Sequence, residues 1–540
     1  MTAGARLPIE VIEHILSWVD RRRDLINFAR ASRACKALVI PRHAEYRVLR
    51  ITDNADCIPT WEHLASRPDL ASNFRVLHLL RAENAITWDG PRTPRTLLGP
   101  DSVPTKLPTV WSSEVVDEFY KRLCDVVERM DKLHTFVWEE LCDGMVFEEH
   151  DEVVLGLVVK KLTLKNLLLI HKGGAVERLL ILLQDRKNPV WGMANLEALV
   201  VDYDRGLNDH PFHDLIVPDT NFGPWVQSLS SSLTLLSTTP TAFAAHCSNL
   251  CLPALRRLSV YEGTEDDAYI TAKIEVFLET HPCIEELSWT PLKRVVLAAN
   301  CLPSLRKLAC SSEFLLALEA ATPPEIQRSS SRKIEELGIN WGGGWNATAI
   351  NLKDLVSLRC LDSSYVKRLR IERLAADSVK DLVSLPQSFP NVWHLYLPSY
   401  FKTLKKDSWL SQREWGQLLS RFPDLEVFLG LNLISSRDSG EESEAYVEEA
   451  VQRFGRWCSK LRQIAHYVEP EDDDECMKDV VRKVLIIREG PDPEARRLAI
   501  WLGKDEQLKN WKKIRWEYAE SAPRDPFQTM PRSDDGRNSA

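Results

Sequence analysis

Apolar residues recur along most of the chain in short segments of the form L-x-x-L-x-L, in which the apolar positions alternate with polar ones. Between Leu196 and Leu461 the copies begin about 29 residues apart on average. A period of this length with this core is the signature of leucine-rich repeats, each of which supplies one strand and one helix. The sequence therefore predicts an α/β fold, an irregular solenoid with parallel strands on a concave face and helices on a convex face.

The clearest copies begin at Asn195, Ala254, Cys283, Ser304, Lys333, Tyr365, Asn391, Asp424 and Lys460, and weaker ones at Asn73, Lys132, Val158 and Ser232. Two segments are nearly duplicated. CLPALRRL at Cys251 returns as CLPSLRKL at Cys301, and IEEL at Ile284 returns at Ile334, so both share an offset of fifty residues. This shared offset indicates that a two-repeat unit was copied, which favours a solenoid over an ordinary α/β domain.

Three segments depart from the repeat. Residues 84–112 are rich in proline and predict a long irregular loop inside a solenoid that spans residues 51–469. Helical spacing over residues 470–520 predicts a C-terminal helical cap, because the terminal repeat of a solenoid needs a polar outer face. Residues 521–540 are polar and contain proline, and we expect a disordered tail there.

The first forty residues follow a helical period instead. One face of a helix that starts near Pro8 is apolar, at Val11, Ile12, Ile15, Leu16 and Val19. Helical spacing continues from Leu25 to Leu38 and ends before Pro41. Two helices this short bury little surface against each other, so we expect the apolar face to contact something else.

The order and spacing of residues 7–38 resemble an F-box, the short helical module by which substrate receptors dock on the Skp-type adaptor of cullin–RING ubiquitin ligases. The matching residues run from Leu7-Pro8-x-Glu10 to Ser32-Arg33-x-Cys35-Lys36-x-Leu38, and Ala37 stands where the family often has tryptophan. The resemblance implies an F-box at residues 1–50. It implies adaptor contacts at Leu7, Pro8, Glu10, Val11, Ile12, Ile15, Leu16, Val19, Leu25, Phe28, Cys35, Lys36 and Leu38. The alternative is a helical hairpin that caps the next domain.

Composition narrows the classes of function. The formal charge of −9 gives no basic footprint for nucleic acid, and no apolar run is long enough for a membrane span. The twelve cysteines form no C-x-x-C pair, so we expect reduced thiols, no zinc site, and a cytoplasmic or nuclear location. The histidines are dispersed and no catalytic motif is present, so we expect neither an enzyme nor a cofactor or metal site.

Charged residues alternate in sign from repeat to repeat. The pairs are Arg256-Arg257, Glu285-Glu286, Arg306-Lys307, Glu335-Glu336 and Lys367-Arg368. Equivalent positions of neighbouring repeats lie side by side, so the pattern predicts a ladder of ion pairs that holds the repeats in register. The alternative is a charged strip that binds a substrate, but regular alternation cancels the long-range field that such a strip would need.

Larger side chains gather later in the array. Arg370, Glu372, His394 and Tyr396 occupy outward positions of adjacent strands, and arginine and aromatic side chains are typical interface anchors. We expect these four residues to form a target-binding surface. The alternative is that Trp393 and Tyr396 pack on the following repeat.

The resemblance and the repeats together imply the substrate-recognition subunit of an SCF-type E3 ubiquitin ligase. The F-box would bind the Skp-type adaptor and its cullin complex, and the repeats would hold a target protein for ubiquitin transfer by other subunits. The alternative is a leucine-rich scaffold that acts outside ubiquitin transfer. A hydrolase hidden in the repeats would be a third possibility, but it lacks a motif.

Overall fold

The computed structural model forms two compact units, Met1–Leu255 and Arg256–Gln528. Their internal architecture follows the same repeating plan of a strand and then a helical segment. The residues that the structure describes are 7–19, 22–40, 43, 46–52, 58–80, 113–139, 148–170, 173–201, 221–260, 268–291, 294–323, 332–339, 349–375, 379–398, 412–430, 454, 457–468, 480–486 and 498–499.

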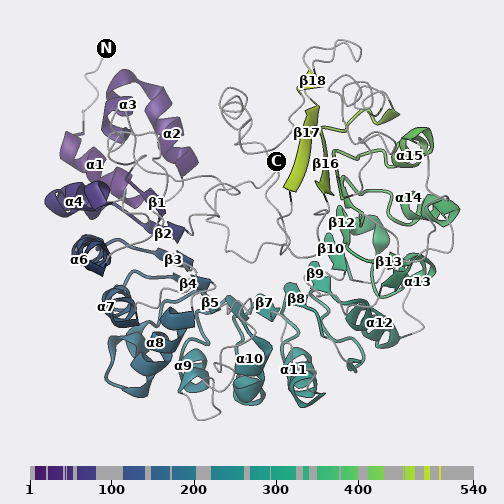
Figure 1. Ribbon diagram of the computed structural model, residues 1–540, viewed down its shortest axis with the longest axis horizontal. Coiled ribbons are helices and arrows are strands. Elements are labelled where there is room, and N and C mark those ends of the chain that lie inside the picture. The colour runs from purple at the N-terminus through teal and green to yellow at the C-terminus, as the bar shows by residue number, and fades with distance from the viewer. Residues whose placement is uncertain are drawn as a thin grey trace. The chain divides into compact units, whose positions relative to one another are not determined.

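The first unit contains a parallel sheet in which each strand pairs with the next one along the chain (Figure 1). Its strands are β1 (Val48–Thr52), β2 (Val76–Leu80), β3 (Thr135–Glu139), β4 (Asn166–Ile170), β5 (Ala198–Val201) and β6 (Leu235–Thr238). The helical segments are α1 (Ile9–Trp18), α2 (Arg22–Ala31), α3 (Arg33–Val39), α4 (Ile58–Ser66), α5 (Pro68–Ala71), α6 (Ser113–Arg129), α7 (Glu148–Val158), α8 (Gly173–Gln184), η3 (Pro189–Gly192), α9 (Phe222–Ser228), α10 (Pro240–His246) and η5 (Cys247–Asn249). The helices from α4 onward lie along one side of the strands.

The second unit repeats this plan with β7 (Arg257–Val260), β8 (Glu286–Trp289), β9 (Lys307–Cys310), β10 (Glu336–Ile339), β12 (Arg368–Ile371), β14 (His394–Tyr396), β15 (Val427–Gly430) and β16 (Gln463–Val468) in parallel order. Its helical segments are α11 (Ala268–Thr280), α12 (Ser312–Ala320), α13 (Leu352–Ser357), η7 (Ser363–Tyr365), η8 (Val379–Val383), α14 (Ser384–Ser388) and α15 (Gln412–Leu419). A small parallel pair, β11 (Ile350–Asn351) and β13 (Leu374–Ala375), lies outside the main sheet. The predicted class, α/β with parallel strands on one side and helices on the other, is confirmed.

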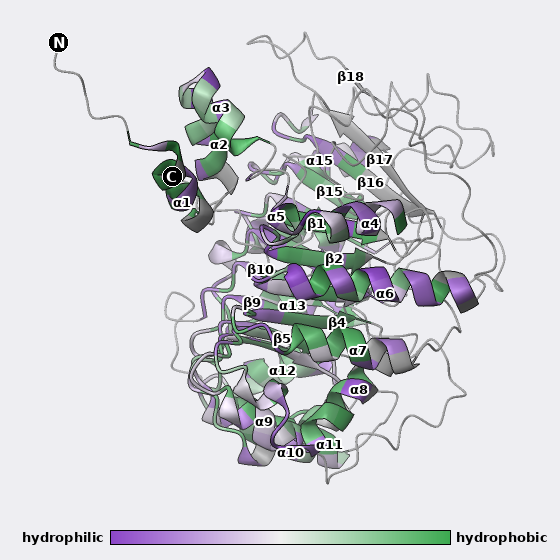
Figure 2. Cartoon of the chain, turned by 90° about the vertical axis from the view of Figure 1, so that its left-hand side faces the viewer, coloured by the Kyte–Doolittle hydropathy of each residue, from purple (hydrophilic) through white to green (hydrophobic). Residues whose placement is uncertain are grey.

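The core of each repeat comes from the apolar positions of the sequence motif. In the repeat of β9, for example, Leu305, Leu308 and Cys310 are all buried. Strand alternation turns the last two of these toward the helices, and the turn before the strand adds the first. Helices complete the core with one apolar face. Along α6, green and purple residues alternate (Figure 2), and Phe119, Leu123 and Val127 are buried.

We call the side of the strands that points away from the helices the strand face. In the first unit part of this face is apolar, because Val137, Leu168, Ile170, Ala198, Val200 and Leu235 form a buried cluster across β3 to β6. These four strands are therefore buried on both faces, as is usual for parallel sheets. The same face also holds a buried ion pair between His78 of β2 and Glu139 of β3, 2.8 Å apart.

The predicted copies of the L-x-x-L-x-L motif coincide with the strands, except that one weak copy is wrong and one further copy was not predicted. The weak copy at Val158 is wrong: α7 ends at that residue, and β4 begins eight residues later in the segment from Leu164. A further copy, Tyr46-x-x-Leu49-x-Ile51, was not predicted, because tyrosine occupies its first apolar position. As a result, the predicted boundary between residues 50 and 51 cuts through β1.

The end of the solenoid also differs from the prediction. Where a helical cap was expected over residues 470–520, β17 (Val480–Ile486) pairs antiparallel with β16, and β18 (Leu498–Ala499) pairs with β17. The apolar run Val480-Val481 and Val484-Leu485-Ile486 is rich in β-branched residues, which favour a strand. The predicted loop at 84–112 and tail at 521–540 lie outside the described residues.

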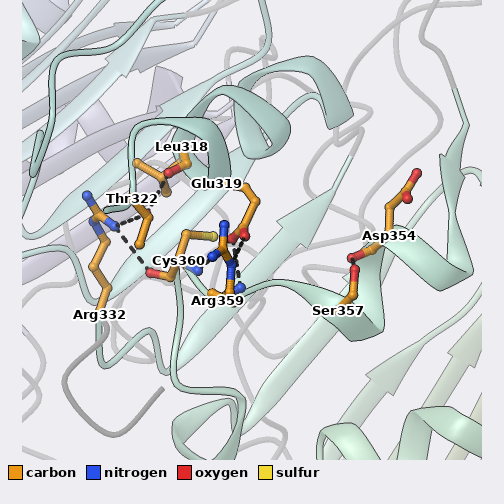
Figure 3. A network of polar contacts seen from close by, with 8 residues as sticks. All are labelled: Leu318, Glu319, Thr322, Arg332, Asp354, Ser357, Arg359 and Cys360. Atoms are coloured by element: carbon orange, nitrogen blue, oxygen red, sulfur yellow. Dashed lines mark hydrogen bonds and ion pairs between the residues drawn. The ribbon is translucent and has the colours of Figure 1, made fainter. Parts of the chain in front are cut away.

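A polar network, buried around Arg332 and exposed at Arg359, ties three repeats of the second unit together (Figure 3). Arg332 donates hydrogen bonds to the carbonyl oxygens of Leu302 and Cys360, both at 3.2 Å, and to Thr322 Oγ1 at 3.3 Å. Glu319 accepts from the Arg359 guanidinium at 2.8 Å and from the amide of Cys360 at 2.8 Å. Burial opposes ionisation of Glu319, but these hydrogen bonds outweigh it and lower the pKa of this carboxyl. The bonds fix the chain where Leu302 adopts a φ of 56°, a left-handed conformation that is rare for leucine.

The alternating charges of the second unit form the predicted ladder. Backbone pairing aligns Glu336 with both Lys307 and Arg368. Ion pairs join neighbouring repeats, namely Arg256–Glu285 at 3.8 Å, Lys307–Glu286 at 2.7 Å, Lys367–Glu335 at 3.1 Å and Arg368–Glu336 at 2.9 Å. Because the charges are paired with one another, the ladder interpretation holds, and a free charged strip is not supported.

The two glutamates of one rung should differ in their contribution to stability. The side chains of Glu336 and Arg368 are only 11% and 14% exposed, whereas those of Glu335 and Lys367 are 41% and 53% exposed. Breaking a buried pair costs about 3–5 kcal/mol, against roughly 0.2–1 kcal/mol for an exposed pair. We therefore expect Glu336→Lys to lower the melting temperature far more than Glu335→Lys. Added salt should reduce the effect of Glu335→Lys on the melting temperature and leave that of Glu336→Lys unchanged.

Thermal melts of both variants and the parent at low and high salt test this. Equal melting temperatures for the two variants would contradict the ladder.

Candidate protein interface

The N-terminal helices form a module with a small core of its own. Leu16 of α1, Leu25 of α2 and Val39 of α3 are buried together, and Ile12, Val19, Phe28, Ala29 and Leu38 pack around them. The sequence predicted one continuous helix after residue 25, but Ser32 interrupts it. The Ser32 hydroxyl accepts a hydrogen bond from the amide of Cys35 at 3.0 Å and caps α3. The resulting fold-back lets this short segment bury more apolar surface than we expected.

The apolar face of α1 divides into two lines. Ile12, Leu16 and Val19 point into the core of the module. Val11 and Ile15 lie one turn apart on a different line, and both are exposed, at 41% and 49%. Leu7, one further turn toward the N-terminus, is 57% exposed and extends that line. The module thus satisfies its own core and still presents apolar side chains to solvent, which is the usual mark of an interaction surface.

Residue Arg47 fastens the module to the first repeat. It precedes β1, and its guanidinium donates hydrogen bonds to the carbonyl oxygens of Leu16 and Val19 at the end of α1. These carbonyls lie at the C-terminus of a helix, where a positive charge is favourable. Burial of the guanidinium lowers the pKa of Arg47 to about 10, so it remains charged at neutral pH. The sequence alone does not reveal this role, because tyrosine at the first apolar position, Tyr46, disguises the first repeat.

The predicted adaptor-binding residues therefore fall into three groups. Exposed residues are Leu7, Pro8, Val11, Ile15 and Lys36, and Cys35 is half-buried. Core residues or residues packed against the core are Ile12, Leu16, Val19, Leu25, Phe28 and Leu38. The side chain of Glu10 lies outside the described residues. Only the first group is placed to meet a partner directly, while the second group shapes the surface from within.

The predicted target surface lies on the strand face of the second unit. Backbone pairing aligns Arg370 of β12 with Tyr396 of β14. The Arg370 guanidinium lies over the Tyr396 ring, 4.6 Å from its centre, and donates to Glu372 Oε1 at 3.0 Å. The fourth predicted residue, His394, is one pleat away on the same strand face. The structure thus brings all four residues together.

A second cation–aromatic pair lies beside the first. The Arg368 guanidinium is 4.6 Å from the centre of the Trp393 ring. Burial, together with the charges of Arg368 and Arg370, lowers the pKa of His394 to about 3, so this ring is neutral at physiological pH. Among the residues that the structure describes, His394 Nδ1 has no hydrogen-bond partner.

These side chains are less accessible than the sequence suggested. Tyr396 is 9% exposed, and the side chains of Arg370 and Glu372 are 13% and 25% exposed. We expected them to project freely from the sheet, and that part of the prediction is wrong. The alternative placed Trp393 and Tyr396 against the following repeat, but each ring lies under an arginine of β12, which belongs to the preceding repeat. A pre-paired surface of this kind still loses little side-chain freedom when it binds.

Within the described part of the chain, no helix has both the length and the apolar character needed to cross a bilayer. Over those same residues, no three histidine, cysteine or acidic side chains gather as they would around a metal ion. The described chemistry is that of packing, ion pairing and cation–aromatic contact.

Comparison with known proteins adds little to this description. No protein-family model and no curated protein matches the chain. Among solved structures, the chain is similar to an internalin (InlF) from Listeria monocytogenes strain 4b F2365. The two share 12% sequence identity and a TM-score of 0.26, and the match covers 51% of this chain and 76% of that chain. A TM-score this low supports no inference about function.

Proposed function

We propose that this chain is the substrate-recognition subunit of an SCF-type E3 ubiquitin ligase. The N-terminal module would dock on the Skp-type adaptor, and the repeats would hold a target protein. The observation that supports the proposal best is the exposed apolar line of Leu7, Val11 and Ile15 on a module whose core is already filled. A capping hairpin would instead turn such residues toward the domain that it caps.

The mechanism proposed here is proximity. Binding the adaptor and the target on one chain makes ubiquitin transfer effectively intramolecular, which raises the local concentration of the target without any chemistry from this chain. Arg47 supports this role, because it holds the module against the first repeat through two hydrogen bonds, one of them buried. We accordingly propose that the chain supplies no catalytic residue, cofactor or metal. If no adaptor binds, a repeat scaffold that acts outside ubiquitin transfer becomes the better description.

Charges placed on the exposed line should abolish adaptor binding and leave the fold intact. We expect the double change Val11→Asp with Ile15→Asp to eliminate co-purification with a Skp-type adaptor, because two carboxylates would be buried in an apolar interface. The melting temperature should not change, since both side chains are exposed. Leu16 is unsuitable for this test because its substitution would disrupt the core of the module.

A matched control is Val153→Asp, an apolar residue on α7 that is 55% exposed. Its adaptor binding should equal that of the parent. Adaptor capture that survives the Val11/Ile15 double change would refute the docking proposal.

For target recognition we propose the strand face formed by Arg370, Glu372, His394 and Tyr396. Arg370→Ala with Tyr396→Ala should weaken capture of target proteins at least about tenfold, because single arginine or aromatic anchors are worth about 2 kcal/mol or more. Quantitative mass spectrometry of captured proteins, with the melting temperature measured alongside, tests this. Ser259→Ala with Ser288→Ala serves as the control at the same strand position. Unchanged capture by the Arg370/Tyr396 variant would place target recognition elsewhere.

A further inference from the structure

The residues that immediately precede the strands of the first unit form a continuous row. We call it the entry row, and it consists of Arg47, Arg75, His134, Lys165, Glu197 and Thr234. The amide of each member from Arg75 onward donates a hydrogen bond to the carbonyl oxygen of the member before it, at 2.7–2.8 Å. Neighbouring members are therefore held at the strand spacing of about 4.8 Å.

The charge pattern of the entry row differs from that of the second unit. There, the equivalent residues Arg256, Glu285, Arg306, Glu335 and Lys367 alternate in sign, and ion pairs join their side chains. In the entry row, three cations and a histidine come first, and the carboxylate of Glu197 follows them. Like charges at neighbouring strand positions are destabilising, and the hydrogen bonds of Arg47 to the end of α1 account for only one member of the run.

The cations of this run act on the titratable groups beside them. Burial and the charges of Arg75, Lys165 and Arg47 lower the pKa of His134 to about 4, although Glu197 acts in the opposite direction. Burial and the charges of Arg75 and Arg47 also lower the pKa of Lys132, while Asp131 opposes them. Bringing an anion to this region would therefore relieve repulsion among the cations.

A cavity of about 460 Å³ opens beside the members of the row from His134 to Thr234. Its lining residues are His134, Leu162, Thr163, Lys165, Asn195, Glu197, Ser232 and Thr234. Three of the hydroxyls are oriented by hydrogen bonds to the backbone: Thr163 donates to Leu133 O, Ser232 to Leu196 O, and Thr234 to Glu197 O. Leu162 is 81% exposed and supplies an apolar wall.

We propose that the entry row and this cavity bind an acidic segment of a partner protein. A carboxylate of the partner would lie near Lys132 and Lys165, and an adjacent apolar side chain would contact Leu162. A protein segment fits better than nucleic acid, because Glu197 and Asp131 interrupt the positive surface and a nucleic-acid strand needs a longer basic stripe. Its residues differ from those of the exposed line of α1 and of the strand face around Arg370, and the proposal does not depend on the ubiquitin-ligase proposal.

Lys165 already pairs with Glu197 at 2.7 Å, so one variant is expected to weaken binding of an acidic peptide and another to strengthen it. The probe is a fluorescein-labelled peptide of glutamate and leucine, and its binding to the full chain is measured by fluorescence anisotropy. Lys132→Ala with Lys165→Ala should raise the dissociation constant at least about tenfold, because two charge-assisted contacts are lost. Glu197→Gln removes the competing carboxylate and should lower the dissociation constant. Added salt should weaken binding by the parent.

Lys367→Ala is a matched control. Lys367 is a similarly exposed lysine, 53% against 48% for Lys165, and it pairs with Glu335 at 3.1 Å in the equivalent row of the second unit. The dissociation constant of the Lys367→Ala variant for the peptide should equal that of the parent. All variants should keep the parent melting temperature within a few degrees. Equal binding by the Lys132/Lys165 variant, or tighter binding of a uridine oligonucleotide than of the peptide, would overturn the proposal.

Discussion

The hydrogen-bond ladder between neighbouring parallel strands is the constraint on which the rest of this structure depends. Because each strand pairs with the next one in chain order, residues at the same position of successive repeats must lie side by side. Apolar positions then stack into a continuous core. The same constraint brings polar positions together whether or not their contact is favourable. The side chains found at one position of successive repeats therefore indicate whether that position stabilises the register or binds a partner.

Residues at equivalent positions of successive repeats have different roles in the two units. In the second unit the charges alternate and pair across the strands, as in Arg368–Glu336, which stabilises the register. In the first unit the strand face of β3 to β6 holds a buried apolar cluster, and the entry row begins with like charges. One physical rule, that neighbouring repeats are in contact, thus yields a ladder in one place and a candidate anion site in another. Arg47 belongs to both the row and the attachment of the helical module.

The sequence predicted the repeats well because leucine at three fixed positions reports burial directly. It placed β7, β8, β9, β10 and β12 at the correct residues and paired their charges correctly. It failed where a different residue filled a motif position, as Tyr46 does before β1. It also failed where an apolar run fits both a helical and a strand period, as in β17, which was predicted to be helical. Accessibility was the least predictable property: the position of Tyr396 on the strand face was foreseen, but its burial under Arg370 depends on a neighbouring repeat.

The central functional claim is that the exposed line on α1 is covered by a partner while the repeats keep their own packing. Hydrogen–deuterium exchange of the full chain, with and without a Skp-type adaptor, measures this most directly. The account predicts that the adaptor slows exchange at the amides of Ile9–Trp18 and leaves the amides of β8 and β9 unchanged. Unchanged exchange over Ile9–Trp18 in the presence of the adaptor, or slowing confined to the strands, would contradict it.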